Sequence, residues 1–131
     1  EIWKFSGRGY LYTEIFKRSD QIYFGTAGLG GYFYILNINT GNPILKLRTG
    51  GTTVIKQCGD YVYLYTDVGR KKSGLAFVNL ADGKILEDIE LPGAASIDSV
   101  LEVYENKAYT ITFQYKNNAV EHAVLSCILL N

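Results

Sequence analysis

The chain has 131 residues, of which 47% are hydrophobic and 20% charged, a composition typical of a globular protein with one core. Thirteen Lys and Arg balance thirteen Asp and Glu, so no net charge attracts the chain to nucleic acid or to an anionic membrane. No apolar run approaches the roughly 18 to 20 residues of a membrane-spanning helix, and the first residues lack the pattern of a signal peptide. The sequence therefore predicts a soluble protein that binds no nucleic acid and inserts into no membrane.

The first residues, Ile2-Trp3-Lys4-Phe5 followed by Gly7, predict a leading strand over residues 1–7. After it come short alternating runs of Tyr, Ile, Val, Phe and Thr, separated by Gly, Asn and Asp. This is the pattern of strands and hairpins, and helical periodicity is hard to find anywhere. The expected fold class is all-β.

Two of these runs match each other at an offset of 40 residues, namely QIYFGT from Gln21 and YVYLYT from Tyr61. A looser third copy begins at Ala108, 47 residues after Tyr61. The strands that follow the three copies also agree: they read YILNIN from Tyr34, AFVNLA from Ala76 and AVLSCI from Ala123. A period of about 40 residues made only of strands is the sequence sign of β-propeller blades, each with four strands.

Glycines mark the connections between these strands. Asn39-Thr40-Gly41 and Ala81-Asp82-Gly83 each join two strands through a short turn, where Gly adopts a positive φ without a clash. Gly50-Gly51 and Pro92-Gly93 then follow the outer strands. We expect the first pair to be hairpin turns and the second pair to be crossings between blades.

The strands IYFGT and GYFYILNINTG, followed by ILKLRTGG, resemble the quinoprotein-like (PQQ-like) propeller repeat. Ile2-Trp3-Lys4-Phe5 is similar to the Trp-bearing strand of that repeat, whereas Leu45 and Leu86 take the place of the tryptophan in the later copies. The resemblance covers nearly the whole chain; it is strongest over residues 20–93 and weak over 96–131. It implies a propeller fold whose loops are often presented to partner proteins or peptides.

Counting strands predicts a β-propeller segment of three four-stranded antiparallel blades. One strand is expected in residues 1–7, four in a blade over 9–48, four in a blade over 52–91, and three in a partial blade over 96–131. The leading strand completes the last blade if the two pair, which leaves no sheet edge open.

Three blades are too few for a ring, because propellers typically close with roughly 4 to 8. Two resolutions are open. The chain is part of a larger propeller and meets the remaining blades, or a second copy assembles with it so that each leading strand completes the other's last blade. The first is favoured because the chain begins at Glu1 and contains no Met.

Metal and redox chemistry find little support in the sequence. Cys58 and Cys127 lie 69 positions apart without CxxC spacing, and His122 is the one histidine that could assist them. Both cysteines lie in apolar strand-like runs, so buried free thiols are favoured over a disulfide. We expect no metal site and no cofactor, and the cellular compartment stays open.

Catalytic motifs are also missing. His122 is interpreted as a surface or turn residue, and no serine lies in a GxSxG context. The glycine-rich stretch over 25–31 lacks the Lys and the following helix of a phosphate loop, so it is interpreted as a hairpin. No catalytic residue is assigned.

Charged residues receive structural interpretations. Glu87, Asp88 and Glu90, like Lys46 and Arg48 on the preceding edge strand, are expected to block edge-to-edge pairing. Arg70-Lys71-Lys72 is interpreted as a solvated hairpin tip. Most of the eleven tyrosines are expected in packed faces, and tyrosines at the end of the central channel are candidates for partner contact.

The favoured function is a non-catalytic binding or scaffolding domain that presents loops to a protein or peptide partner, with no partner-binding residue assigned. One alternative is a fragment of a quinoprotein-like propeller enzyme whose catalytic residues lie outside the chain. That resemblance implies adjacent cysteines and a calcium site of Glu, Asn and Asp, which this sequence does not show. A second alternative is a lectin-like sugar binder with a site on loops 27–31 or 67–74.

Overall fold

The computed structural model describes residues 2–28, 31–50, 54–69, 71–96 and 99–130. Twelve strands form three antiparallel sheets of five, four and three strands, and the described residues contain no helix. No helical segment that could cross a membrane is therefore present in these ranges. The prediction of an all-β protein with three antiparallel sheets is confirmed.

The first sheet differs from the four strands expected because its inner strand is in two pieces. Both β1 and β2 pair with β3 on the side opposite β4, so five strands occupy four positions. The bounds are β1 (Tyr10–Leu11), β2 (Phe16–Arg18), β3 (Gln21–Ala27), β4 (Gly31–Asn37) and β5 (Pro43–Gly50).

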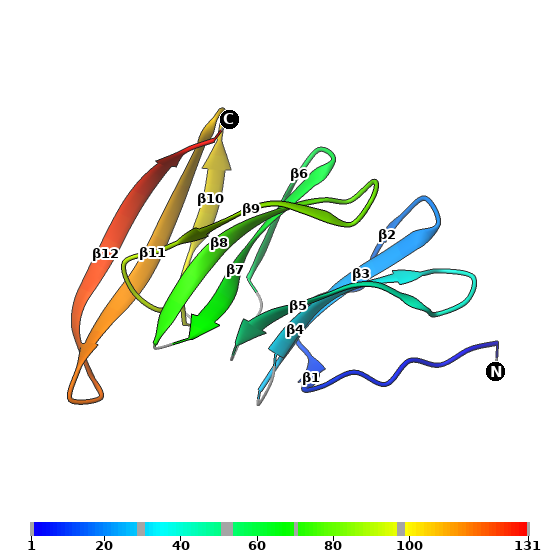
Figure 1. Ribbon diagram of the computed structural model, residues 1–131, viewed down its shortest axis with the longest axis horizontal. Helices are drawn as coiled ribbons and strands as arrows, with labels where there is room; N and C mark the ends of the chain where they lie inside the picture. Colours follow the sequence, from blue (N-terminus) through cyan, green and yellow to red (C-terminus); the bar gives the residue numbers. More distant parts are fainter. Residues whose placement is uncertain (1, 29–30, 51–53, 70, 97–98, 131) are drawn as a thin grey trace.

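The second and third sheets are simple meanders in chain order. The second sheet contains β6 (Ile55–Cys58), β7 (Tyr61–Gly69), β8 (Lys72–Asn79) and β9 (Lys84–Glu90). The third contains β10 (Leu101–Tyr104), β11 (Lys107–Lys116) and β12 (Ala119–Leu129), so it has three strands. Figure 1 shows the three sheets in a row in chain order, with the second between the other two.

Two apolar layers hold this row together. The first layer lies between the first and second sheets and joins Tyr23, Phe33 and Ile35 to Val62 and Leu64, all at most 1% exposed. The second layer lies between the second and third sheets; its fully or largely buried members include Tyr65, Leu75, Phe77, Leu101, Ala108 and Leu130. Successive residues of β7 serve different layers because side chains alternate along a strand. The second sheet is therefore buried on both faces.

The three inner hairpins are built alike. Each has a two-residue turn whose first residue, Ser19, Gly59 or Glu105, has a positive φ. The carbonyl of the second turn residue then accepts a hydrogen bond from the residue at the end of the third strand. The three pairs are Ile38 to Asp20, Leu80 to Asp60, and Leu130 to Asn106, at 2.7, 2.9 and 2.7 Å.

The expected outer hairpin turns are also present among the described residues. Gly41 and Gly83 have φ values of +73° and +70°, and each amide donates to the carbonyl of the Asn four residues earlier. The side chains of Asn37 and Asn79 accept hydrogen bonds from the turn amides that follow them. The crossing expected at Gly51 lies outside the described residues.

The third copy of the repeat departs from its predicted register by one residue in β11 and by three in β12, where Ser126 and not Ala123 takes the position of Ala76. The hairpin turns align Tyr61 with Lys107, which gives an offset of 46 residues and not 47. Ala108 then corresponds to Val62, and both are fully buried on the face toward the preceding sheet. The predicted match of Ala108 with the exposed Tyr61 is wrong, because a slip of one residue exchanges the two faces of a strand.

The leading strand predicted over residues 1–7 is not formed in the described part of the chain. Residues 2–9 belong to no ladder and lie along the outer face of the first sheet. Trp3 Nε1 donates to Ile38 O at 2.9 Å, and the Phe5 ring meets the Tyr34 ring edge-on at 5.0 Å. Figure 1 shows this segment leading into β1 beside the first sheet. Apolar packing without a strand partner replaces the predicted pairing.

Substituting Tyr65→Phe is expected to destabilise the protein by about 1–3 kcal/mol, the cost of leaving buried polar groups unpaired. Tyr65 is 1% exposed; its hydroxyl donates to Val100 O at 2.6 Å and accepts from Ile111 N at 3.0 Å. Urea unfolding measures the change. An unchanged midpoint would contradict this role.

The same substitution is expected to reduce the loss of stability at high pH. Burial raises the pKa of the Tyr65 hydroxyl above its usual value, although the backbone hydrogen bond with Ile111 opposes the rise. The folded state then holds this proton more tightly than the unfolded state, so the contribution is present below about pH 10 and falls as pH rises through the folded pKa. Unfolding curves of both proteins from neutral to alkaline pH measure the difference.

Substituting Gly41→Ala is expected to displace Trp3, because a Cβ there would overlap the Trp3 ring. Trp3 is the one tryptophan of the sequence, so its fluorescence should shift to longer wavelength. Gly83→Ala is the matched control: φ is also positive, but the added Cβ would lie 3.0 Å from Ile44. Equal emission spectra for the two variants would contradict the contact between Trp3 and Gly41.

Candidate functional site

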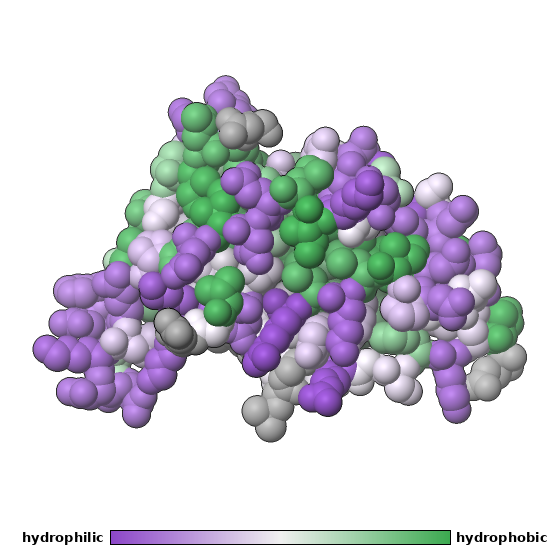
Figure 2. Space-filling view, in the orientation of Figure 1, coloured by the Kyte–Doolittle hydropathy of each residue, from purple (hydrophilic) through white to green (hydrophobic). Residues whose placement is uncertain are grey.

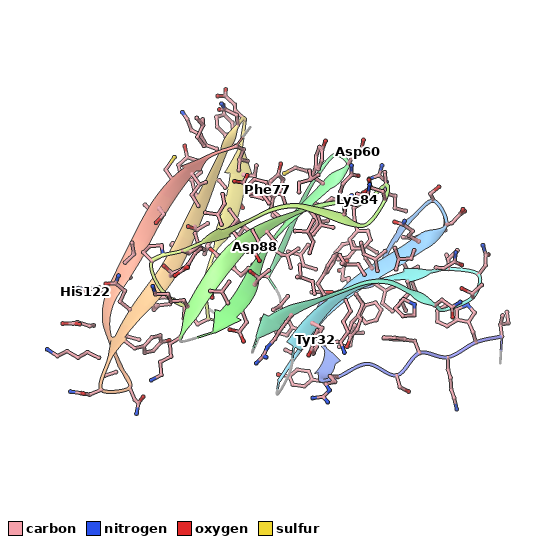
Figure 3. All side chains as sticks on the ribbon, in the orientation of Figure 1. Tyr32, Asp60, Phe77, Lys84, Asp88 and His122 are labelled. Carbon is pink, nitrogen blue, oxygen red and sulfur yellow. The ribbon has the colours of Figure 1, made fainter. Side chains whose placement is uncertain are left out.

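The residues considered for acid, base or metal chemistry do not converge. His122 has a side chain 64% exposed, with Glu121 3.9 Å away. Asp88 accepts a hydrogen bond from Thr66, and Glu90 pairs with Lys72 at 3.0 Å. Figure 3 shows Asp88 on β9 and His122 on β12, in different sheets. Within the described residues, no group of three His, Cys, Asp or Glu side chains could hold a metal ion.

The two cysteines are free, as the sequence favoured, but they are not both buried. Cys58 is half-buried on β6, whereas Cys127 is exposed on β12. The apolar run around Cys127 misled the prediction of burial because one face of the third sheet is open. The two thiols lie in different sheets and form no common site.

The charged edge residues have local contacts. Lys46 Nζ lies 4.5 Å from the centre of the Tyr32 ring, and Arg48 pairs with Asp67 at 3.1 Å. Lys71 has a positive φ in the β7–β8 turn, which agrees with a hairpin tip, while Arg70 lies outside the described residues. Leu29 and Gly30 of the glycine-rich stretch are also outside them.

A pocket of about 280 Å³ opens between the first two sheets, at the end where the inner hairpins turn. It is lined by Arg18, Ser19, Asp20, Gln21, Leu80 and Ala81. The β2–β3 hairpin supplies the polar wall, and the chain after β8 supplies the apolar one. The positive φ of Ser19 makes the tight turn that brings Arg18 and Gln21 opposite each other in the ladder.

Two buried polar atoms of this pocket have no partner among the described residues. Arg18 donates through Nη2 to Asp60 Oδ1 at 2.6 Å, and this contact joins the two sheets. Its Nη1 and the Oε1 of Gln21 are buried and make no hydrogen bond. Arg18 and Gln21 line the pocket, although these two atoms themselves are shielded from it. Buried polar groups are normally paired, so an ordered water or the polar group of a ligand is the expected partner.

Tyr23 lies behind the pocket and links it to the second sheet. Its hydroxyl donates to Gln57 Oε1, and its ring stacks on Phe16 at 5.1 Å. Burial raises the pKa of Tyr23, and the positive charge of Arg18 lowers it in part. The pocket therefore holds the Arg18 guanidinium paired with Asp60, together with the Asp20 carboxylate.

No residue of this pocket was predicted from the sequence. Arg18 and Gln21 flank a hairpin turn and carry no motif. Their meeting with Leu80 and Ala81 depends on how two sheets pack, 60 residues apart along the chain. The positive charge next to a turn was the one visible signal, and it is common on protein surfaces.

No protein-family model matches the chain, and no curated protein matches it either. The case for a function therefore rests on the geometry of the chain itself.

Substituting Arg18→Met is expected to raise the pKa of Tyr23 further, because it removes the nearby positive charge that stabilises the phenolate. An NMR titration of the Tyr23 ring measures the change. Lys17→Met is the control, since Lys17 is an exposed cation on the same strand. An equal Tyr23 pKa in wild type and Arg18→Met would contradict the contact.

Proposed function

We propose that the chain is a non-catalytic β-propeller segment of the quinoprotein-like type, which binds a protein or peptide partner through its hairpin ends. Support for the propeller comes from three successive antiparallel sheets with the same inner turn and the same carbonyl contact behind it. Each sheet also packs on the next through equivalent strand faces. Such repetition suits blades of a propeller.

The observation that carries the binding function is the pair of unused polar atoms in the Arg18–Gln21 pocket. A peptide group has a carbonyl that accepts a hydrogen bond and an amide that donates one. Both atoms are buried in the free chain. Once the two side chains turn toward the pocket, the carbonyl would accept from Arg18 Nη1, and the amide would donate to Gln21 Oε1. The exposed Ala81 would contact the apolar part of the peptide, whereas Leu80 belongs to the buried layer behind it.

Charge and exposure are compatible with this assignment. The Arg18 side chain is 28% exposed and is held in place by Asp60, whose side chain is 70% exposed. A guanidinium held at one side loses little freedom when it binds a carbonyl at the other. The two alternatives receive no comparable support: acid, base and metal-ligating side chains are scattered over the described residues.

The test is selection of random peptides on the immobilised protein, followed by titration of the enriched peptides against variants. Gln21→Leu removes the acceptor at similar volume and should weaken binding by about tenfold or more, as expected for one unmet hydrogen bond. Gln114→Leu is the matched control, since Gln114 is exposed in the third sheet and bonds to Pro92 O.

The control variant should bind the peptides as wild type does. Failure to enrich any peptide, or equal affinity of Gln21→Leu and wild type, would refute peptide binding in this pocket. Ordered water would then be the partner of the two atoms.

A further inference from the structure

Residues 2–9 contact the first sheet as β5 contacts the second. Trp3 lies against Gly41, the positive-φ glycine of the outer turn of the first sheet. Ile44 at the start of β5 lies against Gly83, the glycine of the same turn in the second sheet. The exposure of residues 2–6 also alternates as in a strand: Trp3 and Phe5 are half-buried, and the residues between them are exposed.

The correspondence extends to the next apolar contact. The Phe5 ring lies 6.4 Å from the Phe24 ring, edge-on. Leu47 of β5 packs on the core layer that contains Leu64. Phe24 and Leu64 occupy equivalent positions, since Phe24 is the fourth residue of β3 and Leu64 is the fourth residue of β7. Trp3 and Phe5 are two residues apart, whereas Ile44 and Leu47 are three apart, because β5 has a bulge between its pairs Leu45–Ile35 and Pro43–Leu36. Apart from this bulge, residues 2–9 take the place of an outer strand from a preceding sheet.

One property separates the two segments. Strand β5 also pairs with β4, whereas residues 2–9 pair with no strand in the described chain. At the other end of the row, β12 pairs with β11 on one side, and the described residues supply no partner for its other edge. The molecule therefore has an outer strand without a sheet and a sheet without an outer strand.

The open face of the third sheet has the apolar pattern of a buried one. By register, Tyr109, Ile111, Leu125 and Cys127 occupy the positions of Tyr63, Tyr65, Leu75 and Phe77, which face the third sheet from the second. Leu125 is nevertheless 70% exposed, and Leu129 is 64% exposed. Figure 2 shows hydrophobic surface over the upper part of this sheet.

We propose that residues 2–9 of one copy of the chain pair antiparallel with β12 of a second copy and complete its third sheet. The partner of β12 is a second copy of the chain for a geometric reason. Residues 2–9 already pack against the first sheet of their own copy, so pairing them with β12 places that first sheet over the open face of the third sheet. The third sheet of one copy and the first sheet of the other would then pack on each other as the first and second sheets do within one copy.

The register of this pairing follows from β4 and β5. Phe33 pairs with Leu47 and Tyr34 with Lys46. The equivalent pairs across copies are Phe5 with Leu125 and Lys4 with Ser126. Phe5 and Leu125 then lie side by side on the face that meets the first sheet of the incoming copy.

Two copies satisfy the geometry if the sheets are propeller blades, so this number rests on the proposed function. A head-to-tail contact forms a ring when its rotation closes. Two copies give six sheets, within the roughly 4 to 8 blades of propellers, whereas a third copy exceeds that range. In this assembly residues 2–9 supply the fourth strand of the third sheet, so all three sheets have four strand positions.

Light scattering on a sizing column should give twice the 14.6 kDa chain mass for the wild type. Leu125→Lys places a charge in the contact and should return the mass to one chain, with the circular dichroism spectrum unchanged since Leu125 is exposed in a single copy. Leu86→Lys is the matched control: Leu86 is 56% exposed on β9, outside the contact, and should keep the doubled mass. A wild type of single-chain mass at all concentrations would overturn the proposal.

Cross-linking tests the register. In a background of Cys58→Ser and Cys127→Ser, the pair Lys4→Cys and Ser126→Cys should form a disulfide between copies on oxidation, because facing residues of antiparallel strands lie within disulfide reach. Lys17→Cys with Ser126→Cys is the control and should remain uncross-linked. Equal cross-linking of the two pairs would refute the pairing.

A failure of the proposed assembly can be distinguished from a failure of peptide binding. The Arg18–Gln21 pocket lies within one copy, so a monomer that binds peptides would refute the assembly and leave the proposed binding function intact. A doubled mass without peptide binding would do the reverse.

Discussion

The structure depends on one constraint: a sheet in this row must bury an apolar face against each neighbour. The alternation along β7 meets it, since Val62 and Leu64 enter one layer while Tyr65 enters the other. A strand with two buried faces tolerates no slip in register. The three similar inner turns and their carbonyl contacts fix that register within each sheet.

The two ends of the row meet the constraint differently. The outer face of the first sheet is covered by residues 2–9, so Tyr34 and Leu36 remain 1% exposed although no sheet lies beyond them. The outer face of the third sheet has no such cover among the described residues, and Leu125 and Leu129 face solvent. An exposed apolar sheet face of this kind is typical of an interaction surface. The chain is therefore asymmetric, with one end closed by its own segment.

Local features of the sequence predicted much of the fold, because turn glycines and alternating residues act over a few positions. Gly41 and Gly83 mark the two outer hairpin turns. The second sheet could be predicted because its sequence matches the sequence of the first sheet. The third register was wrong because the Glu105 turn has no glycine to mark it, and because the buried face of β11 is formed by the small residues Ala108, Thr110 and Thr112. The pocket could not be predicted, since Arg18 and Gln21 form it only by packing against the second sheet, which starts 34 residues after Gln21. Residues 2–7 look like a strand, but sequence does not say which chain provides the partner.

The tip of the β11–β12 hairpin is the part of the molecule on which the core depends least. Every residue of 114–120 is exposed, and Asn117 and Asn118 both have positive φ at the turn. Changes in this arm leave both apolar layers untouched. Substitutions at the tip should therefore cost the fold little stability, so this is the part of the chain where the sequence can vary while the packing of the three sheets stays constant.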